Sequence, residues 1–228
     1  MTTPPKTTHS VAARLFQLEL LEKALSANVI ACVPTGGGKT FISILLLRET
    51  ASRRRGKSTT AVFSNKWEKK FGVFLVNTVA LVSQQAAAIR QHTDEEVGEY
   101  FGTVVEGWKK YDWEKEFERN TVLVMTAEIF RGILALGYLD LSEDVEVLIF
   151  DECHHCRGRH PYNAIMEEFY FRIKNQPSQL NIEPTLPKIF GMTASPLNLS
   201  LGRKNLPNSQ GKLSSTTRWT EVNINLSL

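Results

Sequence analysis

The chain has 228 residues, which is enough for one full-sized domain and excludes a large multidomain assembly. Apolar residues make up 42% of the chain and charged residues 22%, a balance that excludes a wholly disordered protein and predicts a buried core. The 27 basic and 24 acidic residues leave a net charge of +3, which is too small to indicate nucleic-acid binding by itself.

The cellular compartment is indicated by features that are missing from the sequence. Three cysteines, an odd number, do not form a disulfide framework and fit a reducing compartment. The first residues lack the apolar segment of a secretory signal, and the longest apolar run, Phe41–Leu47, is far shorter than the roughly 20 residues that cross a bilayer. We expect a cytoplasmic or nuclear protein with no membrane partner.

The two ends of the chain differ in character from its middle. Residues 1–10 are rich in Thr and Pro and predict a disordered N-terminus. An amphipathic helix is predicted over 12–25, because apolar residues recur there at helical spacing: Leu15, Leu18, Leu21 and Leu25. Residues 198–228 mix Ser, Asn and Lys without a period and predict a linker or disordered tail, so the folded domain is expected over 11–197.

Short apolar runs alternate with helical stretches through the rest of the chain. The runs are continuously apolar, as in strands buried on both faces: Val29–Val33, Gly72–Val76, Val97–Phe101, Thr121–Met125, Val145–Phe150 and Lys188–Met192. Helices are expected between them at 39–51, 79–92, 127–136 and 161–174. This alternation predicts a three-layer α/β fold with a mostly parallel central sheet.

A glycine-rich loop follows the first predicted strand and precedes a helix. It comprises Pro34, Thr35, Gly36, Gly37, Gly38, Lys39 and Thr40. Glycines let backbone N–H groups turn inward around phosphates, Lys39 would reach the β- and γ-phosphates, and the Thr40 hydroxyl would bind Mg²⁺. One position departs from the general pattern, because Val33 stands where a glycine is usual. The loop predicts nucleotide binding, with a simple glycine-rich turn as the alternative.

An acidic motif, Asp151-Glu152-Cys153-His154, ends the fifth predicted strand. Carboxyl ends of parallel strands share one edge of a sheet, so these carboxylates are expected beside the glycine-rich loop. Asp151 would hold Mg²⁺ and Glu152 would orient or deprotonate the attacking water. A structural zinc site is the competing interpretation, with ligands drawn from Cys153, His154, His155, Cys156 and His160.

A basic connection is predicted between the second and third elements of this pattern. Residues 48–70 hold eight basic and two acidic side chains, among them Arg53, Arg54 and Arg55. We expect an exposed, solvated loop here, with an RNA-facing patch as the alternative.

Together, Gly36–Thr40 and Asp151–His154 resemble the first RecA-like domain of superfamily-two DExD/H-box helicases. The resemblance implies ATP and Mg²⁺ as ligands and makes Lys39, Asp151, Glu152 and His154 catalytic. It implies further roles for residues elsewhere: adenine reading by Gln17, coupling to hydrolysis by Thr193 and Ser195, and RNA contacts by Asn77, Thr78, Gln85, Thr126 and Ala127.

The resemblance narrows around Asp151–Cys156 with the following His160-Pro161-Tyr162-Asn163, and it covers roughly residues 12–197. These residues are similar to the amino-terminal helicase module of Dicer and Dicer-like proteins, and RNA-sensing innate-immune helicases share much of the pattern. The resemblance implies an ATP hydrolase that acts on double-stranded RNA in small-RNA production.

In that family a second RecA-like domain and ribonuclease III domains complete the enzyme, and neither fits after residue 197. We therefore expect a fragment that binds ATP and turns it over weakly. Two alternatives stay open: a module that binds double-stranded RNA or protein without catalysis, and a fragment of an RNA-sensing innate-immune-type helicase. An unrelated P-loop NTPase such as a kinase or GTPase is a third, and Gln17 and Thr193-Ala194-Ser195 speak against it.

Overall fold

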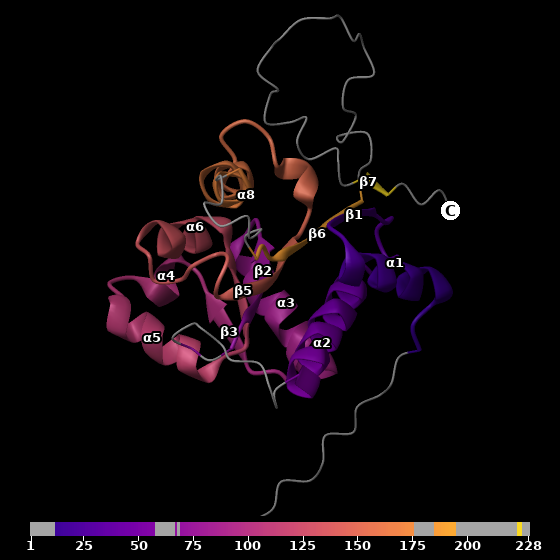
Figure 1. Ribbon diagram of the computed structural model, residues 1–228, viewed down its shortest axis with the longest axis horizontal. Helices are drawn as coiled ribbons and strands as arrows, with labels where there is room; N and C mark the ends of the chain where they lie inside the picture. Colours follow the sequence, from indigo (N-terminus) through magenta and orange to yellow (C-terminus); the bar gives the residue numbers. More distant parts are fainter. Residues whose placement is uncertain (1–11, 58–66, 68, 176–184, 195–222, 225–228) are drawn as a thin grey trace, which may run out of the picture.

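The computed structural model describes residues 12–57, 67, 69–175, 185–194 and 223–224. Its centre is one parallel sheet with the strand order β3-β4-β2-β5-β6-β1-β7 (Figure 1). The strands are β1 (Val29–Cys32), β2 (Phe71–Val76), β3 (Val97–Tyr100), β4 (Val122–Thr126), β5 (Val145–Phe150), β6 (Lys188–Thr193) and β7 (Asn223–Ile224). The two residues of β7 pair with β1 and are the described part of the expected tail.

Helices cover both faces of this sheet (Figure 1). One face carries α1 (Leu15–Ser26), α2 (Lys39–Lys57) and α3 (Val79–His92). The other carries α5 (Lys110–Arg119), α6 (Ala127–Ala135) and a continuous helical segment made of α7 (Pro161–Ile165), a π-helical turn (Met166–Tyr170) and α8 (Phe171–Lys174). A four-residue helix, α4 (Gly102–Val105), follows β3.

Strand β2 shows why the sheet is buried on both sides. Phe71, Val73 and Leu75 pack into the core under α5 and α6, whereas Phe74 and Val76 pack into the core under α1, α2 and α3. Successive strand residues point to opposite faces, so an apolar run with no polar alternation must lie between two helical layers. The expected three-layer α/β fold with a parallel sheet is confirmed.

The predicted elements form close to their expected positions. Each expected strand forms within one residue of its predicted ends, and the expected helices are present. Helix α5 was not expected, because its sequence is mostly charged. It packs through two aromatic side chains, Trp113 and Phe117, which are buried one helical turn apart.

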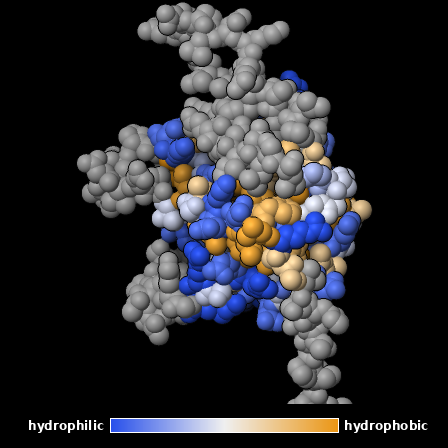
Figure 2. Space-filling model, turned by 90° about the vertical axis from the view of Figure 1, so that its right-hand side faces the viewer, coloured by the Kyte–Doolittle hydropathy of each residue, from blue (hydrophilic) through white to orange (hydrophobic). Residues whose placement is uncertain are grey.

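The buried face of α1 differs in part from the expected one. Leu21 and Leu25 pack against the core as expected, whereas Leu15 and Leu18 are 74% and 47% exposed. The buried residues of the helix are Gln17, Leu20 and Ala24. Figure 2 shows apolar residues gathered in a patch bordered by hydrophilic ones on the side of the molecule that carries α1. The helix and two of its four leucine contacts were predicted correctly. The other two leucines are exposed, and Gln17 is buried instead because its amide forms the hydrogen bonds described below.

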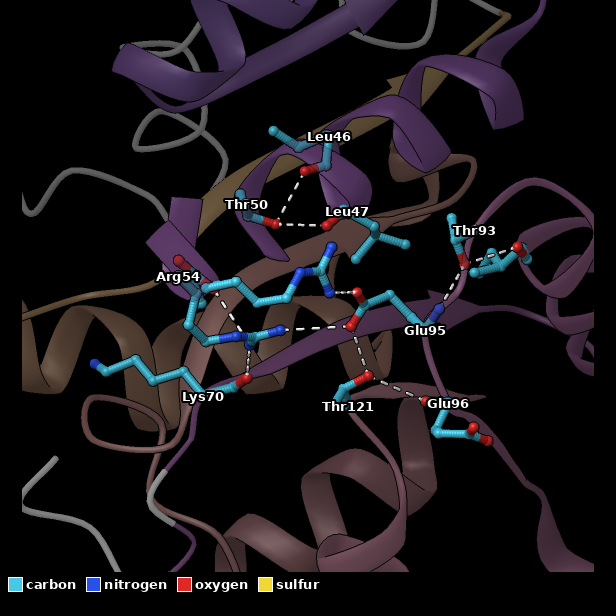
Figure 3. A network of polar contacts seen from close by, with 12 residues as sticks. Leu46, Leu47, Thr50, Arg54, Lys70, Thr93, Glu95, Glu96 and Thr121 are labelled. Carbon is cyan, nitrogen blue, oxygen red and sulfur yellow. Dashed lines mark hydrogen bonds and ion pairs between the residues drawn. The ribbon is translucent and has the colours of Figure 1, made fainter. Parts of the chain in front are cut away.

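The expected basic loop after residue 48 is also wrong in its first part. Helix α2 continues to Lys57, and its last turns bring Arg54 and Arg55 to the carboxylate of Glu95, just before β3 (Figure 3). Glu95 also accepts a hydrogen bond from the Thr121 hydroxyl at 2.8 Å, and Arg54 pairs with Glu146. Glu95 lies two residues before β3, Thr121 directly precedes β4, and Glu146 is the second residue of β5. The network therefore fixes the end of α2 to the edge of the sheet where the strands begin. Residues 58–66 of the connection lie outside the described part of the chain.

Among the described residues, none of the helices combines the length and the apolar character needed to span a membrane.

Candidate nucleotide site

The glycine-rich loop turns between β1 and the start of α2 at Lys39. Gly36 and Gly38 have φ angles of +80° and +84°, a backbone conformation that side chains disfavour. Gly37 has a different constraint, since a Cβ atom there would lie 2.5 Å from Cγ1 of Val33. All three glycines are therefore needed for the shape of this loop, and Pro34 and Thr35 form its exposed side.

Val33 occupies the position where a glycine is usual, and the structure explains the exchange. Its backbone N–H donates to the carbonyl oxygen of Thr193 at 2.9 Å, and its side chain is buried. Val33 thus continues the pairing of β1 with β6, and the turn begins one residue later, where the Gly37 N–H donates to the Pro34 carbonyl. A side chain is tolerated because residue 33 still belongs to the sheet.

Gln17 supports the glycine-rich loop from α1. Its carboxamide oxygen accepts a hydrogen bond from the Arg14 N–H at 2.9 Å, and its Nε2 donates to the carbonyl oxygen of Gly37 at 3.3 Å. The same Nε2 atom would lie 2.5 Å from a Cβ at Gly38. The structure therefore brings the expected adenine-reading residue into contact with the expected phosphate loop.

The acidic motif meets that loop at the carboxyl edge of the sheet. Lys39 Nζ lies 3.6 Å from Oε1 of Glu152 and donates to the carbonyl oxygen of Val33 at 3.3 Å. Glu152 adopts a left-handed backbone conformation with φ +46°, which turns the chain sharply out of β5. Lys39 and Glu152, far apart in the sequence, thus place an ammonium and a carboxylate beside the N-terminus of α2.

Asp151 carries a buried carboxyl group at this edge. Burial raises its pKa to about 6, and the neighbouring Glu152 charge adds to the shift. Gln85 Nε2 lies 3.5 Å from its Oδ2 atom. The Glu152 N–H donates to Oδ1 of Asp151 at 3.0 Å. A buried carboxylate whose pKa is still raised suits a nearby divalent cation, and Thr40 at the start of α2 offers a second hard oxygen ligand. Asp151 and Thr40 therefore fit a Mg²⁺ ion that keeps most of its water and phosphate ligands.

His154 connects the acidic motif to the end of β6. Its Nδ1 atom lies 2.8 Å from the hydroxyl oxygen of Thr193 and 3.2 Å from Oε2 of Glu152. Burial lowers the pKa of His154, and the neighbouring His155 lowers it further, so the neutral ring is favoured. The backbone N–H of Ala194 also donates to Glu152 at 3.4 Å. Ser195, the second expected coupling residue, lies outside the described residues.

The residues expected to contact RNA fall into two groups. Asn77 and Thr78 follow β2, and Thr126 and Ala127 follow or end β4, on strands paired in register at Val76 and Thr126. These four residues therefore share one edge of the sheet. Thr126 and Ala127 are buried, so the N-terminus of α6 offers mainly backbone groups there. Gln85 forms the second group alone: it is buried and points to Asp151, toward the nucleotide site.

The cysteines of the competing zinc interpretation take part in packing. Cys153 and Cys156 belong to the hydrophobic core, and burial raises the pKa of Cys153 to about 12. His160 caps α7, because its Nδ1 accepts a hydrogen bond from the Tyr162 N–H. Within the described ranges no three His, Cys, Asp or Glu side chains gather as a metal site. The capped helix brings the Tyr162 hydroxyl to the backbone of the acidic motif, a contact not expected from the sequence.

Comparisons with known proteins agree with this geometry. The model of the DEAD/DEAH box helicase family matches residues 14–199. The chain is 45% identical over 184 residues to Endoribonuclease Dicer homolog 2 of Arabidopsis thaliana, covering 80% of this chain and 12% of that protein. It is 43% identical over 188 residues to Endoribonuclease Dicer of Gallus gallus, covering 81% and 9%. The chain thus spans about a tenth of the length of these relatives.

A solved structure shows the same architecture. The helicase domain of Hef from Pyrococcus furiosus matches with a TM-score of 0.58 and 24% sequence identity, covering 81% of this chain and 34% of that one. At this identity the likeness shows the fold, and it confirms the expected RecA-like arrangement.

Proposed function

Since the chain belongs to the DEAD/DEAH box helicase family, we propose that residues 11–197 are the ATP-binding RecA-like domain 1 of a Dicer-type, RNA-dependent ATPase. The observation that carries this proposal is the meeting of Lys39 and Glu152 at the N-terminus of α2, with their polar atoms 3.6 Å apart. An ammonium, a water-orienting carboxylate and a helix N-terminus are the groups that phosphoryl transfer to water requires.

The residues divide the work as follows. The N–H groups of Gly36–Thr40 and the N-terminus of α2 bind the phosphates. Lys39 then breaks its ion pair with Glu152 and neutralises charge on the β- and γ-phosphates. Glu152 is then free to orient the attacking water and accept its proton. Mg²⁺, held by Asp151 and Thr40 when bound, neutralises charge on the phosphate oxygens.

His154 and Thr193 form the route by which RNA influences hydrolysis. His154 contacts both Glu152 and Thr193, so a movement of β6 changes the position of the water-orienting carboxylate. RNA lies along the edge formed by Asn77, Thr78 and the start of α6, where hydroxyl and backbone donors bind phosphates without reading bases. Backbone recognition suits double-stranded RNA, whose deep, narrow major groove hides its base edges. The protein acts in the cytoplasm, or in the nucleus, in small-RNA production.

Hydrolysis by the 228-residue chain alone is weak in this proposal. In related phosphoryl-transfer enzymes an arginine supplied by a second element accelerates the reaction about 10³–10⁵-fold. A second RecA-like domain would supply that arginine, and ribonuclease III domains would cut the RNA.

The test is a titration of labelled ATP, with Mg²⁺, against the chain and two variants. Lys39→Ala is expected to weaken binding at least tenfold, and Lys110→Ala, an exposed lysine at the start of α5, is expected to leave it unchanged. Equal loss in both variants, or binding that survives Lys39→Ala, would contradict the assigned site. Binding of double-stranded RNA without any ATP binding would favour the non-catalytic binding module.

A further inference from the structure

The hydroxyl of Tyr162 lies where the acidic motif leaves the sheet. Tyr162 is fully buried in the first turn of α7, and its ring packs edge-on against Phe150, the last residue of β5. The hydroxyl oxygen is 2.9 Å from the carbonyl oxygen of Asp151 and 3.0 Å from that of Leu75. Both neighbours are acceptors, so the single hydroxyl proton is shared between them. Tyr162 therefore links the end of β5 to its neighbour β2.

The peptide group that Tyr162 binds is the one that orients both acidic side chains. The Asp151 N–H donates to the Leu75 carbonyl at 3.0 Å and closes the pairing of β5 with β2. One residue later, Glu152 has the left-handed backbone conformation. The carbonyl bound by Tyr162 belongs to the peptide between these two residues. The N–H of the same peptide, at Glu152, donates to Oδ1 of Asp151 at 3.0 Å, so rotation of the peptide would remove a hydrogen bond that orients the Asp151 carboxylate.

The segment before α7 holds Tyr162 in place through its own hydrogen bonds. His160 Nδ1 accepts from the Tyr162 N–H at 3.2 Å, and Asn163 Nδ2 donates to the Gly158 carbonyl at 3.0 Å. The His160 N–H donates to the Arg157 carbonyl at 3.0 Å. The loop between the acidic motif and α7 is thus held by its own hydrogen bonds, and it places the Tyr162 hydroxyl against the Asp151 carbonyl.

We infer that Tyr162 is a positioning residue for the acidic motif, holding the Asp151–Glu152 peptide so that Asp151 faces the metal and Glu152 faces the attacking water. The hydroxyl acts through the backbone and touches neither nucleotide nor metal. This inference rests on the proposed function, because it concerns the geometry of the same ATP site.

The variant Tyr162→Phe removes only the hydroxyl, and Tyr170→Phe is its matched control. Tyr170 is also buried, and its hydroxyl oxygen accepts a hydrogen bond from Asn28 at 2.8 Å, just before β1 and at the opposite edge of the sheet. Both variants lose one buried hydrogen bond and are expected to have similar melting temperatures. Only Tyr162→Phe loses a contact with the acidic motif.

The first readout is the ratio of ATP affinities with Mg²⁺ and with EDTA. Tyr162→Phe is expected to reduce the gain from Mg²⁺ about 3- to 10-fold, the effect of one hydrogen bond, and Tyr170→Phe to leave it unchanged. A merely structural role would lower the melting temperature and leave the ratio as in the wild-type chain. An unchanged ratio in Tyr162→Phe would overturn the inference.

The second readout needs no ligand. Hydrogen exchange in the nucleotide-free chain is expected to become faster for the peptide that contains residues 150–153 in Tyr162→Phe and to stay unchanged in Tyr170→Phe. If Tyr162→Phe exchanges faster but the wild-type chain does not bind ATP, the proposed function is refuted, and the role assigned to Tyr162 in it is refuted as well. Wild-type binding with unchanged exchange would overturn the inference alone.

A further variant covers the case in which Tyr162→Phe does not fold. Asn163→Ala releases the loop from Gly158 and keeps the hydroxyl, so a smaller loss of the Mg²⁺ gain, about 2-fold, is expected. No change in that variant would overturn the inference.

Discussion

Replacing Glu95 with Ala removes the carboxylate that fastens the end of α2 to the sheet. The side chain of Glu95 is 4% exposed and pairs with Arg54 and Arg55, and it accepts the Thr121 hydroxyl (Figure 3). Arg54 would keep Glu146 as a partner, and the side chain of Arg55 is 61% exposed, so water would replace its lost contact. The cost therefore falls near the lower end of the range for breaking a buried ion pair, about 3 kcal/mol.

Unfolding by urea, followed by tryptophan fluorescence, measures this cost. A loss of about 3 kcal/mol corresponds to a melting temperature lower by about 6–12 °C in a domain of this size. The matched control is Glu49→Ala, since Glu49 forms an exposed ion pair with Arg53 one turn away on the same helix and is expected to cost less than about 0.5 kcal/mol.

The same variant also tests where the network acts. The affinity for Mg²⁺ and ATP is expected to stay unchanged in the folded Glu95→Ala protein, because the network and the glycine-rich loop lie at opposite edges of the sheet. A free energy of unfolding within about 0.5 kcal/mol of the Glu49→Ala value would refute the assigned stabilising role.

Three further predictions concern the nucleotide edge. The raised pKa of Asp151, about 6, means that its charged form opposes folding above that pH and ceases to do so as the pH falls toward 4. Asp151→Asn should therefore stabilise the nucleotide-free chain in urea melts by about 1–2 kcal/mol at pH 8 and hardly at pH 4.5, and equal effects would contradict the shift. Gly37→Ala should weaken binding of ATP with Mg²⁺ at least about tenfold in the same titration, whereas Gly132→Ala, where a Cβ meets open space in α6, should bind normally. Iodoacetamide at pH 8 should modify half-buried Cys32 before buried Cys153, as read by peptide mass spectrometry, and early modification of Cys153 would refute its place in the core.

The sequence predicted that the glycine-rich loop and the acidic motif lie together, because both follow local patterns. The glycine-rich loop and Asp151 each follow an apolar run, and parallel strands bring such ends together whatever the length of chain between them. The three-layer fold was predictable for the same reason, since a strand without polar alternation requires helices on both sides.

The errors arose where a distant partner decides the environment. The leucines of α1 have helical spacing, yet Gln17 is buried instead of Leu15, because the loop carbonyl of Gly37 accepts its amide. Arg54 belongs to a strongly basic segment that reads as solvated, and Glu95, which neutralises it, lies on a different element. Neither partner is visible in a local pattern, so the burial of Gln17 and the extension of α2 to Lys57 could not be predicted from the sequence.

In the proposed function RNA and ATP bind separate but coupled sites, and this coupling is measured directly as the ATP affinity with and without double-stranded RNA. With Mg²⁺ present, saturating double-stranded RNA is expected to tighten ATP binding several-fold, and double-stranded DNA of the same sequence is expected to have a much smaller effect. By reciprocity, ATP should tighten RNA binding by the same factor. An ATP affinity that is identical with and without RNA, or that responds equally to DNA, would contradict the proposed RNA-dependent ATPase.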